Sequence, residues 1–342
     1  MEKARFKWVL RERNRKIAAK TEAFTEQQAR RVRSFHSSFK EYSPTPLIEL
    51  TSLAQHLGIK NLFVKDESYR FGLNAFKVLG GSFAIGSYIA NELGEDIDDL
   101  PYMRLVSDEV RSLLGSKTFI TTTDGNHGRG VAWTANRLKQ QAIVYMPQGS
   151  AAERLANIRA EGAQAEITDM NYDDTVRYTS ELAQKNGWII VQDTAWDGYT
   201  RVPLWIMQGY MTMALEAYEQ LPVKPTHIFL QAGVGSLAGS VQGFFADIYG
   251  RSCPLTFIVE PKGADCLYQT AAANDGSLHS VTGRLETIMA GLACGELNSI
   301  AWEILGNLSD GFISCPDYTA AQGMRILGNP LAGDTKVSAG ES

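Results

Sequence analysis

The sequence has no run of about 18 consecutive apolar residues, the length that a membrane-spanning helix requires. Residues 1–5 are charged and lack the apolar stretch of a secretory signal peptide. Repeats of solenoid period and low-complexity segments are also absent. These absences argue against membrane, secreted and repeat proteins, so we expect a globular protein of the cytoplasm.

Metal-binding patterns are missing as well. The four cysteines have no CxxC-type pairing and are Cys253, Cys266, Cys294 and Cys315. Four of the five histidines show no ligand spacing and are His36, His56, His227 and His279. We therefore assign no metal and expect reduced thiols, with a Cys266–Cys294 disulfide as the minor alternative.

Positive charge is concentrated at one end of the chain. Residues 1–40 carry 12 Lys or Arg against four acids, whereas the whole chain has a net charge of −5. Apolar residues, among them Trp8, Phe24 and Val32, interrupt these charges. This mixture favours an arm that packs on its own protein over one that binds a polyanion such as nucleic acid.

The chain of 342 residues is 44% hydrophobic and contains 31 glycines, which is typical of an α/β protein with many tight turns. Strands are predicted at 118–123, 142–146, 163–167, 188–192, 226–230 and 254–259, with helices at 126–139, 151–160, 173–185, 207–218 and 236–249 between them. This alternation indicates right-handed parallel βαβ units. We interpret residues 91–108 as a surface insertion or linker, and 337–342 as a strand and turn at an incomplete C-terminus.

Three segments contain the chemistry. In residues 74–82 a single lysine, Lys77, lies among apolar residues before a predicted helix, where desolvation would lower its pKa and favour a nucleophilic amine. Residues 231–239 form a glycine-rich turn from a strand into a helix, whose N–H groups, with the Ser236 hydroxyl, would hold a phosphate. The third segment, residues 121–128, is also a strand-to-helix turn and contains Asp124. An acid in such an anion-binding turn is unfavourable unless the chemistry uses it.

Together, and in this order, the three segments resemble the fold-type II pyridoxal-phosphate enzymes, the family of threonine and serine dehydratases, cysteine synthase and tryptophan synthase β. The resemblance covers about residues 40–342 and includes Thr-Pro-Leu at 45–47 and Val-Glu-Pro at 259–261. It implies two domains, each an open, mostly parallel, twisted sheet flanked by helices. Residues 1–88 and 195–342 would form the larger cofactor domain, and 89–194 the smaller substrate-side domain.

The resemblance also implies roles for individual residues. Lys77 would form the Schiff base with pyridoxal 5'-phosphate, and Asn126 would contact the 3'-oxygen of its ring. The phosphate would be bound by Gly233, Val234, Gly235, Ser236 and Leu237. Ala75 stands where the wider family has serine, and Val234 and Ser236 interrupt the usual run of glycines. The partner of the pyridine nitrogen would lie at or beyond residues 341–342 and is left unassigned.

Three further motifs, at 123–128, 192–196 and 289–296, resemble the branch of the family that acts on diamino acids. By this resemblance the substrate is 2,3-diaminopropionate, as the D and also the L isomer, and the products are pyruvate and two ammonia. Lys77 and Asp124 would take the Cα proton from opposite faces. Thr123, Asp124, His127 and Asp193 are the candidate substrate-binding residues, although packing is the alternative for His127 and capping of a turn for Asp193.

Three other functions are weighed against this one. A serine/threonine dehydratase or β-replacement synthase of the same fold differs in its preference for serine. A protein that binds the cofactor without turnover would release no ammonia. A nucleotide-binding dehydrogenase fits less well, because no acid ends a second strand at the required spacing after 233–239. We expect a homodimer that binds a small amino acid and neither nucleic acid nor membrane.

Overall fold

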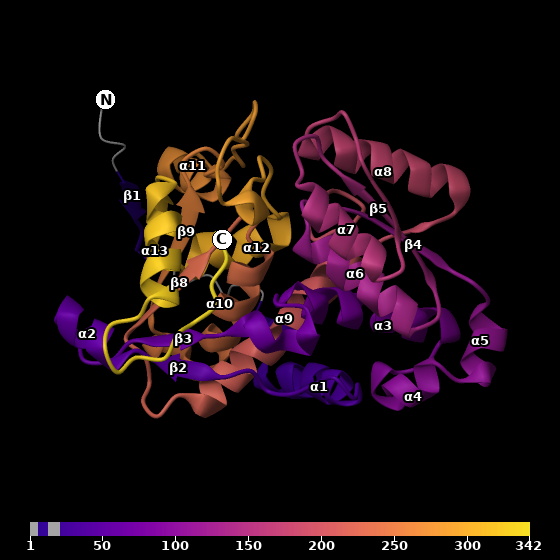
Figure 1. Ribbon diagram of the computed structural model, residues 1–342, viewed down its shortest axis with the longest axis horizontal. Coiled ribbons are helices and arrows are strands. Elements are labelled where there is room, and N and C mark those ends of the chain that lie inside the picture. The colour runs from indigo at the N-terminus through magenta and orange to yellow at the C-terminus, as the bar shows by residue number, and fades with distance from the viewer. Residues whose placement is uncertain (1–5, 13–20) are drawn as a thin grey trace.

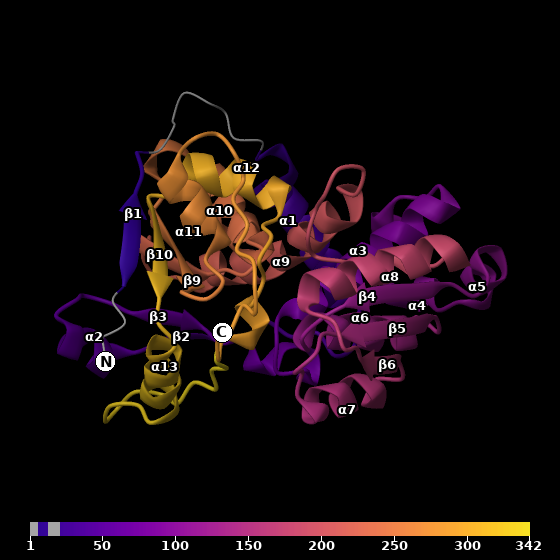
Figure 2. The ribbon, with the colours of Figure 1, turned by 90° about the horizontal axis from the view of Figure 1, so that it is seen from above.

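The computed structural model describes residues 6–12 and 21–342. They form two units, each built on a parallel or mostly parallel sheet with helices around it, which lie side by side in two perpendicular views (Figures 1 and 2). This arrangement confirms the predicted α/β architecture. Within the described ranges, no helix is both long enough and apolar enough to cross a membrane.

The larger sheet has the strand order β1-β10-β9-β8. Its strands are β1 (Lys7–Leu10), β8 (His227–Gln231), β9 (Leu255–Pro261) and β10 (Gly311–Cys315). The last three are parallel, and β1 pairs antiparallel with β10. Buried residues such as Ile258 and Phe312 give these strands the β-branched and aromatic character that a covered sheet requires.

The smaller sheet has the order β6-β5-β4-β7, and all its pairs are parallel. Its strands are β4 (Thr118–Thr122), β5 (Gln141–Met146), β6 (Gln164–Ile167) and β7 (Ile189–Ile190). Each differs from its predicted range by at most two residues at either end. A separate antiparallel pair consists of β2 (Leu47–Glu49) and β3 (Phe63–Lys65).

Helices surround both sheets (Figure 1). Those before the smaller sheet are α1 (Glu26–Ser37), α2 (Thr51–Leu57), α3 (Lys77–Leu93), α4 (Tyr102–Leu105) and α5 (Asp108–Leu114). The helices between its strands are α6 (Asn126–Arg137), α7 (Ala152–Ala160) and α8 (Tyr172–Asn186). The remaining ones are α9 (Arg201–Gln220), α10 (Ser236–Tyr249), α11 (Cys266–Ala273), α12 (Ser299–Leu308) and α13 (Tyr318–Gly328).

Two predictions of local structure were wrong. Residues 91–108 are not a surface linker, because they contain the end of α3, a short 3-10 turn and α4, and they bury Ile97, Leu100 and Leu105. Residues 337–342 form no strand. Val337 is nevertheless buried and donates its backbone N–H to the Leu327 carbonyl, so this segment is held against the protein. The chain ends between the two sheet units (Figures 1 and 2).

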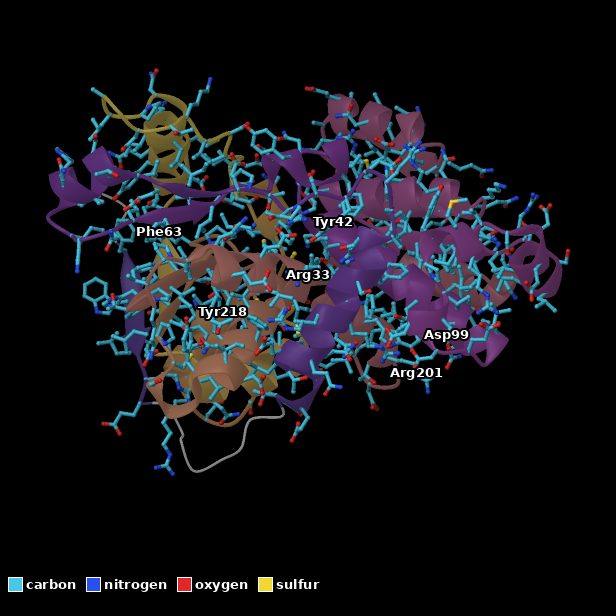
Figure 3. The ribbon with its side chains drawn as sticks, turned by 90° about the horizontal axis from the view of Figure 1, so that it is seen from below. Arg33, Tyr42, Phe63, Asp99, Arg201 and Tyr218 are labelled. Atoms are coloured by element: carbon cyan, nitrogen blue, oxygen red, sulfur yellow. The ribbon has the colours of Figure 1, made fainter. Side chains whose placement is uncertain are left out.

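The basic N-terminal arm packs on the protein, as predicted, over the part that the structure describes; residues 1–5 and 13–20 lie outside it. Phe24 and Val32 are buried, while Trp8 on β1 is 66% exposed. Figure 3 shows α1 from below, with Arg33 labelled. The arginines of α1 pair with acids of the same chain: Arg30 and Arg33 with Glu219, and Arg31 with Asp96 and Asp98. These ion pairs neutralise the positive charges that would be required to bind a polyanion.

A buried ionic cluster joins the region around β2 and β3 to α9. Arg70 is fully buried and donates to both carboxylate oxygens of Glu216, at 2.9 and 2.7 Å. Lys65 Nζ lies 2.8 Å from the same carboxylate, and Glu67 also accepts from Arg70. Burial tends to raise the pKa of Glu216, but the two cations outweigh it and lower that pKa to about 2. Glu216 therefore compensates two cations that would otherwise lie in a dry environment.

We expect Glu216→Gln to lower the free energy of unfolding by about 3–5 kcal/mol, because it leaves Arg70 and Lys65 without their shared anion. Urea unfolding at neutral pH measures the loss. Glu219→Gln is the matched control on the same helix, since the Glu219 side chain is 36% exposed and its pairs with Arg30 and Arg33 are screened by water. That control should cost no more than about 1 kcal/mol. Equal losses in the two variants would contradict this account of the cluster.

Candidate active site

One cavity of about 880 Å³ is lined by residues of both sheet units, among them Asp124 after β4 and Gly233 after β8. All of the candidate residues from the sequence contribute to its lining, which includes Lys77, Thr123, Asp124, Asn126, His127, Asp193 and the turn formed by Gly233, Val234, Gly235, Ser236 and Leu237. The strands β4, β7 and β8 each end at this cavity, as expected for ligands bound at the carboxyl ends of parallel strands. Segments far apart in the sequence therefore meet in one pocket.

Lys77 is the first residue of α3, so the helix begins six residues earlier than its predicted start at 83. Its Nζ forms an ion pair with Asp193 Oδ2 at 2.6 Å. Burial tends to lower the pKa of Lys77, but the Asp193 carboxylate outweighs it and holds the pKa above its usual value. The prediction of a lowered lysine pKa was therefore wrong for this structure, because the sequence did not reveal that an acid 116 residues away is its neighbour.

The same ion pair has the opposite effect on the pKa of Asp193. It follows β7, and its side chain is 6% exposed. Burial tends to raise its pKa, but Lys77 outweighs burial and lowers the pKa to about 2. Asp193 beside Lys77 is therefore negatively charged at neutral pH.

Asp124 lies in the turn between β4 and α6. Thr123 Oγ1 accepts the Gly125 N–H at 2.9 Å and so fixes this turn. Arg154 Nη1 donates to the Asp124 Oδ2 at 3.0 Å and to its backbone carbonyl at 3.2 Å. Burial raises the pKa of Asp124 to about 6, although Arg154 and Lys77 act to lower it. Asp124 can therefore hold or release a proton close to neutral pH, which a general base requires.

His127, the second residue of α6, is 4% exposed. Its Nε2 makes a hydrogen bond of 2.7 Å with the Val191 carbonyl, and burial lowers its pKa. The ring is therefore neutral and anchored to the strand end. This geometry favours the packing interpretation of His127 over a role in proton transfer.

The glycine-rich turn connects β8 to α10. Gly235 caps the helix with φ +95°, in the region that favours glycine, and no side chain caps the N–H groups that follow. Ser236 Oγ donates instead to the Asp193 carbonyl at 2.5 Å and accepts from Asn298 at 2.8 Å. The Ser236 hydroxyl is thus committed to the protein, so an anion at this turn would depend on backbone N–H groups.

Sequence reasoning missed three residues of the site. Arg154 and Tyr172 line the cavity, and buried Asn298 caps α12 while its amide holds the Ser236 hydroxyl. Of these three residues, only Arg154 could have been placed in the site from the sequence. The strand before α7, β5, pairs in parallel with β4, so the loops that follow both strands emerge at the same edge as Asp124.

Cys266, Cys294 and Cys315 are free cysteines, so the Cys266–Cys294 disulfide considered from the sequence is not formed. Cys294 lines the pocket, and its Sγ lies 3.3 Å from the position that a Cβ on Gly233 would occupy. Cys266 Sγ lies 3.9 Å from the Gly233 carbonyl. Glu260 has a structural role, since it accepts the N–H groups of Leu267 and Tyr268 near the start of α11.

The fold and the pocket define a class of enzyme that holds a phosphorylated cofactor between a lysine and a helix N-terminus. Comparisons with known proteins agree. The family model described as pyridoxal-phosphate dependent enzyme matches residues 39–331. The diaminopropionate ammonia-lyase of Escherichia coli K12 is 52% identical over 323 residues, which are 93% of this chain and 79% of that protein.

Solved structures of the Escherichia coli diaminopropionate ammonia lyase are also similar. Its holo form superimposes with a TM-score of 0.91 and 49% identity, over 98% of this chain and 83% of that one. Its complex with an aminoacrylate-PLP azomethine reaction intermediate gives a TM-score of 0.88 and 48% identity, over 98% and 83% of the two chains. The chain belongs to the family of pyridoxal-phosphate dependent enzymes and, within it, groups with the diaminopropionate ammonia-lyases.

The residues of the pocket fit pyridoxal 5'-phosphate. Lys77 supplies the amine, and the uncapped start of α10 supplies N–H donors for a phosphate. The backbone of Gly233 lies close to Leu292, since a Cβ built on Gly233 would be 3.1 Å from the Leu292 Cα. With glycine at this position, no side chain occupies the space in which the phosphate would bind.

We expect Gly235→Ala to weaken cofactor binding about tenfold or more, since an alanine at φ +95° is strained by about 1–2 kcal/mol and its Cβ would press on Ala301 and Leu267. Titration of the cofactor-free protein with pyridoxal phosphate, followed by the cofactor's absorbance, measures the affinity. Gly323→Ala is the control, because a Cβ there meets nothing within 4 Å. Unchanged affinity in Gly235→Ala would exclude this turn as the phosphate site.

Proposed function

We propose that this chain catalyses the α,β-elimination of 2,3-diaminopropionate, as the D and also the L isomer, to pyruvate and two ammonia. The observation that carries the proposal is that one pocket contains two groups able to move a proton, Lys77 and Asp124, together with a second acid, Asp193. The name and 52% identity of the Escherichia coli relative support the same activity.

Pyridoxal phosphate, when bound, supplies an electron sink for the bond that breaks at the substrate Cα. The remaining tasks fall to the protein. Lys77 would bind the cofactor through its amine, and would be available as a base whenever that amine is not engaged with the cofactor. Asn126 is proposed to orient the cofactor ring, and Gly233 to Leu237 to hold its phosphate.

Asp124 is proposed as the second base, on the face opposite Lys77. The two residues come from different elements, the start of α3 and the turn before α6, and both line the cavity. With a pKa raised to about 6, Asp124 is mostly ionised at neutral pH and still basic enough to accept a proton. Two bases on opposite faces would allow both enantiomers to react.

The acids of the pocket favour a cationic substrate. Asp193 already holds one ammonium group, that of Lys77, at 2.6 Å. When Lys77 is engaged with the cofactor, Asp193 is available for the β-ammonium of diaminopropionate. Serine has no such charge, so it gains less from this site. Thr123 and His127 would contribute mainly by fixing the walls of the substrate site, since each already makes a hydrogen bond to the backbone.

We also propose the wider organisation inferred from the sequence. Residues 1–88 and 195–342 would act as the cofactor domain and 89–194 as the substrate-side domain. A cytoplasmic homodimer is proposed as the working form, supported by the exposed apolar side chains of Trp8 and Leu10 on the edge strand β1.

Asp124→Asn should slow one enantiomer of diaminopropionate by about 10²–10⁴-fold, the contribution of a general base, and spare the other. In the wild type, the rate for that enantiomer should fall as the pH drops below about 6, because burial raises the Asp124 pKa to that value and protonation removes the base. Ammonia release from D- and L-diaminopropionate, measured against pH, tests both statements.

Asp173→Asn is the matched control for that experiment. Burial raises the Asp173 pKa to about 6 as well, yet the residue is not part of the cavity lining. Its substitution should leave both enantiomers unaffected. Equal activity of Asp124→Asn on the two isomers would rule out the two-base mechanism.

Asp193→Asn should raise the KM for diaminopropionate about tenfold or more, because the β-ammonium loses a buried anion. The effect on KM for serine should be smaller, since serine carries no β-charge. Steady-state kinetics on both substrates measure the difference. An equal loss on serine and diaminopropionate would show that Asp193 acts only by supporting Lys77.

A further inference from the structure

Arg154 links three parts of the pocket that the proposed mechanism treats separately. It lies in the first turn of α7, and its Nη1 reaches both Asp124 Oδ2 and the Asp124 carbonyl, at 3.0 and 3.2 Å. Its Nη2 donates to Glu341 Oε1 at 2.5 Å. One guanidinium therefore joins the smaller sheet unit, the acid in the turn and the C-terminal segment.

The arginine stem lies directly across the Asp124 turn. A Cβ built on Gly125 would be only 3.1 Å from Arg154 Cδ, so a larger residue at 125 would displace the stem. The planar guanidinium then contacts both the side chain and the main chain of Asp124, which fixes the side chain relative to its backbone. Such a two-point contact defines where the carboxylate points better than a single charge would.

Charges of both signs surround Asp124. Lys77 at the start of α3 and Arg154 on α7 favour its ionised form, whereas Asp193 after β7 opposes it. Tyr172 on α8 and the Cys294 thiol also face it. In the proposed reaction Lys77 is engaged with the cofactor, which leaves Arg154 as the cation that stays beside Asp124.

We propose that Arg154 is a positioning residue for the Asp124 base, which keeps its carboxylate oriented and ionised, and that Glu341 weakens this effect by sharing the guanidinium. The inference rests on the proposed function only in that Asp124 serves one enantiomer as a base. Arg154 is proposed to act through Asp124, whose carboxylate and backbone carbonyl it contacts.

The acid limb of the pH–rate profile gives the sharpest test. In the holoenzyme, Arg154→Gln should move the acid limb of kcat/KM about one pH unit higher for the enantiomer that depends on Asp124, because an adjacent cation is lost. At pH 6 this is a loss of about fivefold that recovers towards pH 8. The limb for the other enantiomer should stay in place. Arg154→Lys keeps the charge and should shift the limb by less than half as much.

Glu341→Gln should act in the opposite direction. It removes the anion that shares Arg154, so the limb for the same enantiomer should move to lower pH. Arg159→Gln is the matched control on α7, because Arg159 donates only to the Ala165 carbonyl outside the pocket. This control should shift neither limb.

A second measurement does not depend on turnover. Carbon-13 NMR of protein labelled at the aspartate carboxyl carbons follows the titration of Asp124, whose signal is assigned by its loss in Asp124→Asn. The Asp124 midpoint should rise in Arg154→Gln and fall in Glu341→Gln. An unmoved midpoint, or equal slowing of both enantiomers without a shift of either limb, would reduce Arg154 to a packing role and overturn the proposal. A wild type that releases no ammonia would refute the proposed function alone, because the NMR titration still decides the role of Arg154.

Discussion

The site depends on the close packing of α3 against two other helices. On one side a Cβ on Gly209 of α9 would lie 2.3 Å from the Leu79 carbonyl, and on the other a Cβ on Gly130 of α6 would lie 2.8 Å from the Val78 Cα. Only glycine permits backbones to approach this closely. Because α9 belongs with the larger sheet and α6 with the smaller one, this double contact places the first residue of α3, Lys77, at the junction between them.

From that junction, a chain of polar contacts connects Lys77, the proposed catalytic lysine, to the proposed phosphate turn. Lys77 pairs with the Asp193 side chain, the Asp193 carbonyl accepts the Ser236 hydroxyl, and Ser236 in turn accepts from Asn298. All of these groups are largely buried, so each hydrogen bond is costly to leave unmade. A shift of the α10 turn is thereby transmitted to the acid beside Lys77. The structure gives a physical reason why cofactor binding and substrate binding would be coupled in this pocket.

The sequence predicted what depends on local periodicity. The strands β4, β5 and β6 and the helices between them follow from alternating apolar runs and glycine turns, and the three chemical segments follow from motifs. Long-range neighbours were not predictable. Residues 91–108 look polar, yet Ile97, Leu100 and Leu105 are buried in a hydrophobic core that also contains many residues distant in the sequence. The shift of the Lys77 pKa was predicted in the wrong direction for the same reason. The apolar sequence neighbours of Lys77 predict desolvation, whereas its ion pair with Asp193 exists only in the folded structure.

The two pocket acids show how one fold can give like residues unlike roles. Asp193 and Asp124 are both aspartates in turns at strand ends, and burial tends to raise the pKa of each. The Lys77 contact at 2.6 Å overrides burial at Asp193 and lowers its pKa to about 2, so this residue is negatively charged as long as an ammonium group lies beside it. At Asp124, burial prevails over Arg154, which divides its charge with Glu341, and the pKa is raised to about 6. A difference of this size between the pKa values of two carboxylates distinguishes an acid that binds a cation from one that transfers a proton. Burial, which prevails at Asp124 over Arg154 and Lys77, therefore lets this residue titrate where the proposed base is useful.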